Sequence, residues 1–366
     1  MAKLLGTKLR LLREGAGLIQ DEVGKAVGLS GEFISQLEIG RRRPSLDSLT
    51  SLAGFFKKDV SYFLTEEGDA FDLLSSDLGA QPKQAAVLRK FRQRCEDYLF
   101  LEDSTSRRIE PAPEYFRVSP ESMAGEERRR LGIGLAPIAD IFSLVETNGL
   151  RLIRQPIDLD MKIAGIYVFL KNEEAAFALV NCSQSSGLQK MMAAHLYCHF
   201  LRDRRDGPVV DNPDVLVAEY VSLYHPKEQF AQKFASRFLL PPERIREILQ
   251  KDVGKSGLCF EHVLYLKRRL DVGIFALLQA LKDLGLLSPS KSKEFQEKDA
   301  DRLEESIFGD VRKPEEKVVH SQREIFSDRY RWLSVEALRK GRLDAQNIPK
   351  RLVKQLSRFQ PLLKEI

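Results

Sequence analysis

Residues 191–200 read Met-Met-Ala-Ala-His-Leu-Tyr-Cys-His-Phe, an apolar run without glycine or proline that carries two of the chain's five histidines. His195 and His199 are four residues apart, so on a helix both imidazoles lie on one face with their Cβ atoms about 6 Å apart. This spacing suits two ligands of one tetrahedral zinc ion. Two core histidines satisfied by hydrogen bonds would show the same spacing, so the surrounding sequence has to distinguish a metal site from an ordinary core.

The residue after the first histidine matters for chemistry. Zinc helices of proteases read H-E-x-x-H, and the glutamate is the general base of the reaction. In this chain Leu196 stands at that position. Losing a general base costs roughly 10²–10⁴-fold in rate. The motif therefore predicts a metal-binding scaffold without its hydrolytic group.

Length and composition indicate the broad class of protein. A chain of 366 residues should form two or three domains, and 43% hydrophobic with 30% charged residues is typical of a globular protein. Neither a membrane-spanning apolar run nor a secretory signal is present in the sequence. Four scattered cysteines without a C-x-x-C pair favour a reducing compartment. We therefore expect a cytoplasmic protein, and its net charge of +5 is compatible with nucleic acid.

Residues 1–66 are expected to form a bundle of short helices. The turn Gly28-Leu29-Ser30 separates a helix over 20–27 from a helix over 31–39, and Ser30 is a natural N-cap for the second of these. Gly40 ends that helix, three arginines follow, and Pro44-Ser45 opens another helix. This order of elements predicts a helix-turn-helix.

The same stretch resembles the XRE/Cro-type repressor DNA-binding domain over its whole length. The resemblance implies that the helix beginning at Gly31 lies in the major groove, that Gln36 pairs with adenine and that Glu32 accepts from a cytosine amino group. It implies this set of DNA-binding residues: Gln20, Ser30, Gly31, Glu32, Phe33, Gln36, Arg41 and Arg42. The implied partner is double-stranded operator DNA bound by a homodimer.

Two observations keep an alternative open for this domain. Ile19 stands where the family usually has a small polar cap. Glu32 and Phe33 also make a poor surface for DNA, so the fold could instead dock a protein. Residues 67–120 are expected to be a linker containing one helix over 84–101 with a solvated basic face.

Residues 121–290 show a mixed pattern. Strand-like runs over 150–154, 163–169 and 176–180 precede the paired-histidine helix, which is the order expected of a small metallopeptidase core. Two further helices are expected within 258–288, broken at Asp271-Val272-Gly273.

This central region resembles the ImmA/IrrE family of zinc peptidases, which are often fused to an XRE domain. The resemblance rests on Gly134-Leu135, Pro137-Ile138, the run ALVN ending at Asn181, the two histidines, and EQFAQKFASRFLLPPERI over 228–245. It implies a zincin-like α+β fold, zinc as cofactor, and Glu228 as third ligand beside His195 and His199. Phe230 takes the ligand's place if the family glutamate directly precedes Ala231, and His225 is another candidate ligand.

The sequence leaves three states of this site open: no metal, bound zinc without proteolysis, and a peptidase that uses another base. Residues 291–366 are expected to be a charged helical extension with one amphipathic helix around Trp332, Leu333, Ala337 and Leu338.

Taken together, the sequence predicts a DNA-binding transcriptional regulator whose rear domain is an inactive sensor or interaction domain. The main alternative is a zinc-dependent endopeptidase that cleaves a repressor, and a third reading is a protein that only binds a protein partner.

Overall fold

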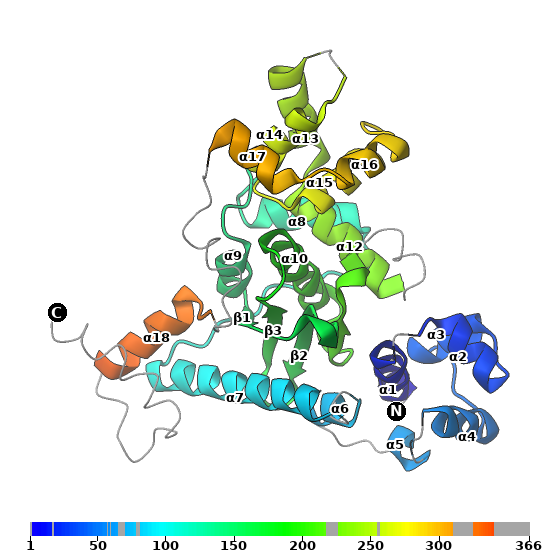
Figure 1. Cartoon of the computed structure of the whole chain (residues 1–366). Helices are drawn as coiled ribbons and strands as arrows, with labels where there is room; N and C mark the ends of the chain where they lie inside the picture. Colours follow the sequence, from blue (N-terminus) through cyan, green and yellow to red (C-terminus); the bar gives the residue numbers. More distant parts are fainter. Residues whose placement is uncertain are drawn as a thin grey trace.

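A computed structural model of the chain describes residues 2–16, 18–56, 58, 60–64, 70–77, 81–216, 226–254, 257–309 and 325–339. Figure 1 shows an N-terminal group of helices beside a central sheet, with a second group of helices above it. The predicted ligand candidate His225, parts of the predicted linker and the charged stretch 340–366 lie outside the described residues.

The N-terminal region folds as five short helices around one core. Their bounds are α1 (Ala2–Gly15), α2 (Gln20–Val27), α3 (Gly31–Glu38), α4 (Leu46–Phe55) and α5 (Val60–Leu64). Gly28 ends α2 with a φ of 72°, a left-handed conformation that glycine adopts without steric cost. The Ser30 hydroxyl accepts a hydrogen bond from Phe33 N at 3.1 Å and so caps α3. The predicted helix-turn-helix is confirmed.

The central region contains a four-stranded mixed sheet. Its strands are β1 (Leu150–Gln155), β2 (Gly165–Leu170), β3 (Ala175–Asn181) and β4 (Val209–Asp211), in the order β1-β3-β2-β4. β1 runs parallel to β3, whereas β2 is antiparallel to both β3 and β4. The three predicted strands are present within one or two residues at each end, and the short edge strand β4 was not predicted.

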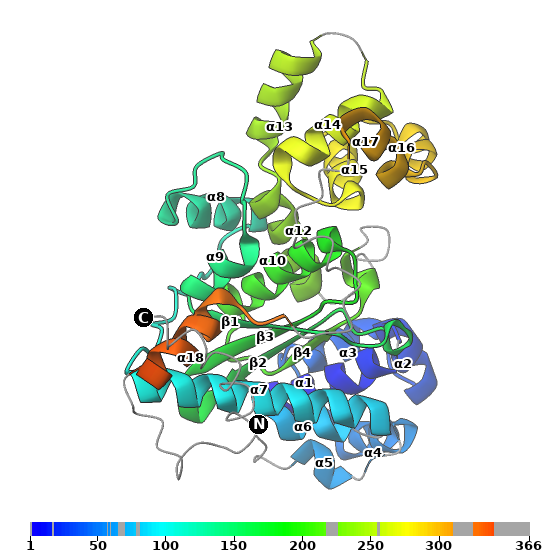
Figure 2. The same cartoon turned by 60° about the vertical axis from the view of Figure 1, so that its left-hand side comes forward.

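Helices cover both faces of this sheet. On one face lie α9 (Ile141–Thr147) and α10 (Ser186–Arg202), and on the other lie α6 (Ala70–Asp77), α7 (Pro82–Thr105) and α18 (Asp328–Arg339), as Figures 1 and 2 show. Strand β3 shows the resulting alternation, because Ala178 and Val180 join the first core while Phe177 and Leu179 join the second. The burial of both faces explains why β3 reads as a continuous apolar run.

The segment predicted as a linker is part of this core. Helix α7 is longer than expected, and its buried Val87, Phe91 and Tyr98 belong to the cluster that covers the second face of the sheet. The expected solvated basic face is only one side of the helix. Because the strands are apolar on both faces, the sheet requires this second covering layer.

A further group of helices packs above α10. It comprises α8 (Pro120–Arg130), α12 (Pro226–Leu239), α13 (Pro242–Ile248), the π-helical turn η4 (Leu249–Val253), α14 (Phe260–Leu270), α15 (Ile274–Asp283), α16 (Pro289–Gln296) and α17 (Ala300–Phe308). Three short 3-10 turns, η1 (Leu159–Met161), η2 (Lys171–Glu173) and η3 (Pro213–Leu216), complete the described elements. The predicted break between α14 and α15 is present, with Asp271 at a φ of 53°.

Helix α10 is held close to the sheet. Asn181, the last residue of β3, accepts hydrogen bonds from Ile157 N and Ser183 N, both 3.0 Å, and so fixes the turn before the helix. At Gly165 in β2 a Cβ atom would lie 2.6 Å from the sulfur of Met192, so a larger residue there would displace the Met192 side chain. These contacts set the position of the histidine-bearing face of α10.

The C-terminal helix α18 is anchored on a buried carboxylate. Glu146 Oε1 accepts hydrogen bonds from Tyr98 Oη at 2.8 Å and from Ser327 Oγ at 2.7 Å. Leu333 and Ala337 are buried as predicted, while Trp332 remains 45% exposed. Burial raises the pKa of Glu146 to about 7, although the bonds from Ser327 and Tyr98 oppose the shift. The folded protein therefore favours the protonated form of this group.

The raised pKa of Glu146 predicts a pH-dependent stability. Between about pH 4.5 and 7 the folded state binds more protons at Glu146 than the unfolded chain, so the stability falls as the pH rises through this window. We expect Glu146→Gln to be more stable than the native chain at pH 8, by up to about 3 kcal/mol, with the gain vanishing near pH 4.5. Urea unfolding monitored by circular dichroism measures this, and the exposed Glu297→Gln serves as control. An equal gain at pH 5 and pH 8 would contradict the assignment.

Candidate metal centre and nucleic-acid interface

Three predicted ligands meet in the interior of the central region. His195 and His199 project from one face of α10 toward α12, which brings Glu228, and all three side chains are buried. Glu228 Oε2 lies 3.1 Å from the Nε2 atoms of both histidines, and these two nitrogens are 3.2 Å apart. The structure thus brings together the three residues predicted as ligands.

The separations suit a metal ion. Zinc bonds of about 2.0–2.1 Å in a tetrahedral site place neighbouring ligand atoms roughly 3.3–3.4 Å apart. The three observed separations of 3.1–3.2 Å are close to this value. Within the described residues Glu228 Oε1 is buried without a hydrogen-bond partner and forms an ion pair with Arg10 Nη1 at 3.6 Å, so Oε2 is the oxygen that faces the two imidazoles. The residues present fit a divalent metal.

A fourth group, Asp211, was missed from the sequence. Asp211 closes β4, and its Oδ2 atom lies 3.4 Å from His195 Nε2. The four candidate ligand atoms all lie within 4.8 Å of one another. A three-residue edge strand gives no periodic signal, so nothing in the sequence could have linked this carboxylate to the histidines 12–16 residues earlier.

The electrostatics of the cluster favour a negative carboxylate. Burial raises the pKa of Glu228, but the two imidazoles outweigh it and hold that pKa well below its usual range. Burial lowers the pKa of His195. At His199 burial is outweighed by the Glu228 charge and by Asp203, 3.5 Å from Nδ1, and the pKa rises to about 10. These shifts favour an ionised Glu228 beside a protonated His199.

The other sequence candidates lie elsewhere. Leu196 faces Gly165 in β2 and brings no carboxylate to the cluster. Phe230 stacks with the guanidinium of Arg202, 4.0 Å from the ring centroid, so the alternative placement of a ligand at this position is not supported. Cys198 is buried, and burial raises the pKa of its thiol, which disfavours the thiolate needed to bind a metal.

Helix α3, which the resemblance places in the major groove, exposes only part of its implied DNA-binding residues. On α3 the Gln36 side-chain amide donates to Glu32 Oε1 at 3.1 Å, and the Arg42 guanidinium lies over the Phe33 ring at 5.3 Å. Gly31 is half-buried at the start of this helix, and Arg41 is exposed after it. Glu32 is exposed on this helix, whereas Phe33 and Gln36 are half-buried.

A buried ion pair fixes the angle between α1 and α3. Arg13 Nε donates to Glu38 Oε1 at 2.6 Å, and both side chains are buried. Gln20, implied as a DNA-binding residue, donates its amide to Glu38 Oε2 at 2.8 Å. In this conformation Gln20 connects α2 to the same ion pair, and its backbone remains at the start of α2.

Comparison with known proteins assigns the N-terminal region. A family model described as a helix-turn-helix domain matches residues 4–57. An uncharacterized HTH-type transcriptional regulator of Sinorhizobium fredii, y4dJ, is 43% identical over 53 residues, which cover 69% of that protein and 14% of this chain. The chain belongs to the HTH-type transcriptional regulators. It is thus a DNA-binding regulator with an XRE-like helix-turn-helix at its N-terminal end.

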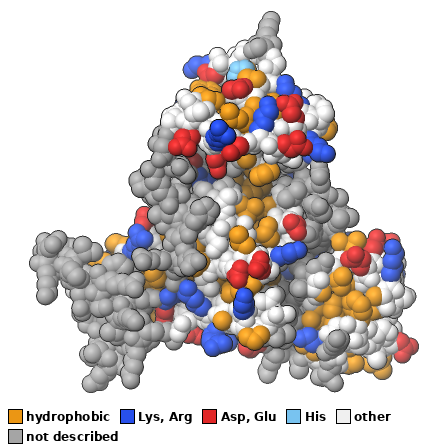
Figure 3. Space-filling view, in the orientation of Figure 1, with side chains coloured by type: hydrophobic (Ala, Val, Ile, Leu, Met, Phe, Trp, Pro, Cys, Tyr) orange, Lys and Arg blue, Asp and Glu red, His pale blue; other side chains and the backbone are white. Residues whose placement is uncertain are grey.

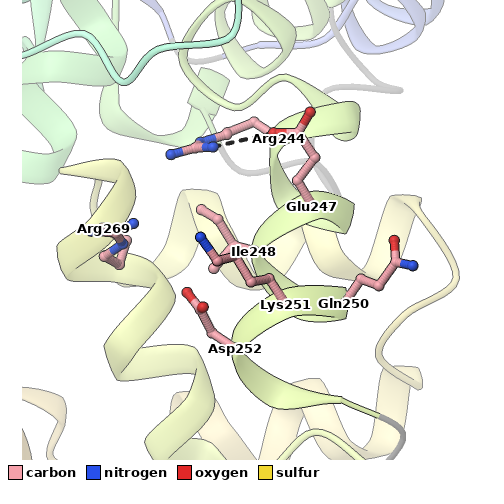
Figure 4. A pocket seen from close by; sticks show the side chains of 7 residues that line it. All are labelled: Arg244, Glu247, Ile248, Gln250, Lys251, Asp252 and Arg269. Atoms are coloured by element: carbon pink, nitrogen blue, oxygen red, sulfur yellow. Dashed lines mark hydrogen bonds and ion pairs between the residues drawn. The ribbon is translucent and has the colours of Figure 1, made fainter.

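In the helical group above α10, this regulator contains an open pocket of about 550 Å³ that lies between α13 with η4 on one side and α14 on the other. Figure 4 shows Arg244 and Arg269 on opposite sides of it, with Asp252 below them. Arg244 pairs with Glu247 at 3.2 Å, so the pocket presents both signs of charge. We assign it no role in the regulator.

None of the regulator's helices within the described ranges combines the length and the apolar character that crossing a bilayer requires.

Proposed function

We propose that this chain is an operator-binding regulator of the XRE type whose second domain is ImmA/IrrE-like, holds a zinc ion and does not hydrolyse peptides. The cluster of two histidines and two carboxylates supports this proposal most strongly. Four buried ligand groups converge in it, yet Leu196 stands in place of the general base. In this proposal the metal domain is a sensor attached to the DNA-binding domain.

His195, His199 and Glu228 would hold the ion, and Asp211 would supply the fourth ligand. A bound zinc would act as a Lewis acid where a coordination position stays open, whereas structural sites use four protein ligands. With Asp211 within reach, this chain's own residues can fill the fourth position. Asp203, beside Nδ1 of His199, would orient that imidazole. This donor set supports binding rather than turnover.

On the DNA side, α3 would enter the major groove and a homodimer would read two half-sites. Exposed apolar side chains on α4 and α5, Leu46, Phe55 and Leu64, offer a surface for a second copy. Figure 3 shows apolar side chains gathered on the visible face of this N-terminal group. The exposed arginines after α3 supply positive charge for phosphates.

Operator binding can be tested on the full chain with a selected DNA site. We expect Gln36→Ala to weaken specific binding about 5–150-fold, because a bidentate contact to a base contributes about 1–3 kcal/mol. We expect Arg41→Gln to weaken binding to all sequences alike and to lower the salt dependence by about one phosphate contact. Fluorescence anisotropy at several salt concentrations measures both effects. Binding without sequence preference would favour the alternative of a protein-docking module.

Metal content is the second test. We expect about one zinc per chain by elemental analysis of the purified protein, because three ligand atoms already stand at tetrahedral separations. His195→Ala should lose the metal, since breaking the ligand set removes a buried donor. His262→Ala is the matched control, because His262 lies on α14 beside Cys259 and away from the cluster. Metal-free protein in both the native chain and the control would refute the proposed site.

A second candidate function is a peptidase that cleaves a repressor. In this candidate Asp211 would act as the general base, because Leu196 stands where the motif has its glutamate. One observation favours it: Asp211 Oδ2 stands 3.4 Å from a ligand nitrogen, within reach of a water attacking a substrate bound there. This candidate predicts cleavage of a co-expressed repressor that is abolished by a chelator and reduced about 10²–10⁴-fold in Asp211→Asn. The proposed regulator predicts no cleavage in either protein, so incubation and electrophoresis separate the two.

A further inference from the structure

Helix α1 has two buried faces. Leu5, Leu9 and Leu12 pack into the core of the DNA-binding domain. Thr7 and Arg10, three residues apart on another face, contact the central region instead. Figure 1 shows α1 between the central sheet and the pair α2 and α3. The DNA-binding domain is therefore joined to the metal-binding region through this helix.

The contacts of this second face are close. Thr7 Oγ1 donates to Asp206 O at 2.6 Å, and Arg10 Nη2 donates to Pro208 O at 3.3 Å. Between them lies Gly207, with a φ of 116°, where a Cβ atom would come within 2.4 Å of the Thr7 methyl. A side chain at position 207 would therefore collide with Thr7 of α1, so glycine allows the loop before β4 to lie against this helix.

Arg10 also reaches the metal cluster. Its Nη1 atom lies 3.6 Å from Glu228 Oε1, and the two side chains are 4% and 2% exposed. Glu228 thus faces the histidines with one carboxylate oxygen and the arginine with the other. A residue of the DNA-binding domain forms part of the surroundings of a proposed metal ligand.

Because both are positively charged, a divalent metal ion and the Arg10 guanidinium would compete for the Glu228 carboxylate. Without a metal, the Arg10 cation compensates carboxylate charge in a buried site, where electrostatic interactions are strong. A divalent ion held by Glu228 and Asp211 would neutralise both carboxylates. The buried guanidinium would then face a cation, and like charges in a dry site repel.

We propose, building on the metal site of the proposed function, that a divalent metal and Arg10 compete for Glu228, so that metal binding weakens the docking of α1 on the loop 206–208. The DNA-binding domain moves with α1, because the Arg13–Glu38 pair ties this helix to α3. The metal is then an effector that controls how firmly the DNA-binding domain is held. By linkage, docking opposes metal binding to the same extent.

The linkage can be measured on the full chain with Co²⁺ and a chromophoric chelator as competitor. We expect Arg10→Gln to bind Co²⁺ roughly 5–150-fold more tightly, the range usual for coupled sites. Arg10→Lys keeps the charge and should stay near the native affinity. Lys25→Gln removes an exposed cation of the same domain and should have no effect. Equal affinities in the native chain and in Arg10→Gln would overturn the competition, and so would tightening in Arg10→Lys equal to that in Arg10→Gln.

The docking of α1 can also be measured directly, in a protein that keeps Arg10. Thr7 is buried against Asp206, so a thiol placed there by Thr7→Cys, in a Cys259→Ser background, should react slowly with a maleimide. Loading with Co²⁺ and removal of the excess should increase the labelling rate several-fold, and no increase would overturn the proposal. If neither the native chain nor Arg10→Gln binds Co²⁺, the metal site itself fails. Metal binding with no effect of Arg10 and no change in labelling rejects only the linkage.

Discussion

A buried polar group has to be paired, and the Nε2 atoms of His195 and His199 meet that requirement through one carboxylate oxygen. Both nitrogens face one oxygen of Glu228 across about 3.1 Å, and all three side chains are buried. The surrounding structure keeps them there. α10 is fixed against β2 at Gly165, α12 crosses α10 to deliver the carboxylate, and β4 ends beside the same nitrogens. A core built only for stability would have filled this volume with apolar side chains.

Features that depend on residues close together in the sequence were predictable, whereas features that depend on tertiary contacts were not. The helix-turn-helix followed from Gly28, Ser30 and Gly40, because each marks the end or start of a helix through its own backbone preference. The histidine pair followed from the spacing of the motif, whereas Glu228 was implied by the resemblance to the ImmA/IrrE family. Asp211 did not, because its place depends on the pairing of β4 with β2 rather than on any local pattern. The two covering layers of the sheet could have been inferred only from the fully apolar run of β3.

The DNA-binding domain shows how one ion pair can organise several elements. The Glu38 carboxylate accepts from Arg13 on α1 and from Gln20 on α2, so the two helices that support α3 share a single acceptor. Gln20, which the resemblance implies as a DNA-binding residue, is thereby also part of the domain's internal framework. The resemblance implies a DNA contact for Gln20. The structure shows that its side chain also donates a hydrogen bond to Glu38, which the sequence alone did not reveal.

The covering of the sheet's second face has a consequence for the order in which the chain acquires its structure. Helix α7 comes from the first third of the sequence, whereas α18, which packs on it, ends at Arg339, and Ile325 pairs with Arg154 at the edge strand β1. Domains usually fold from the N-terminus during synthesis, at about 5–20 residues per second. The DNA-binding domain is complete long before the ribosome has delivered α18. For some seconds the nascent chain therefore carries a folded DNA-binding domain, while the second face of the central sheet still lacks the cover of α18.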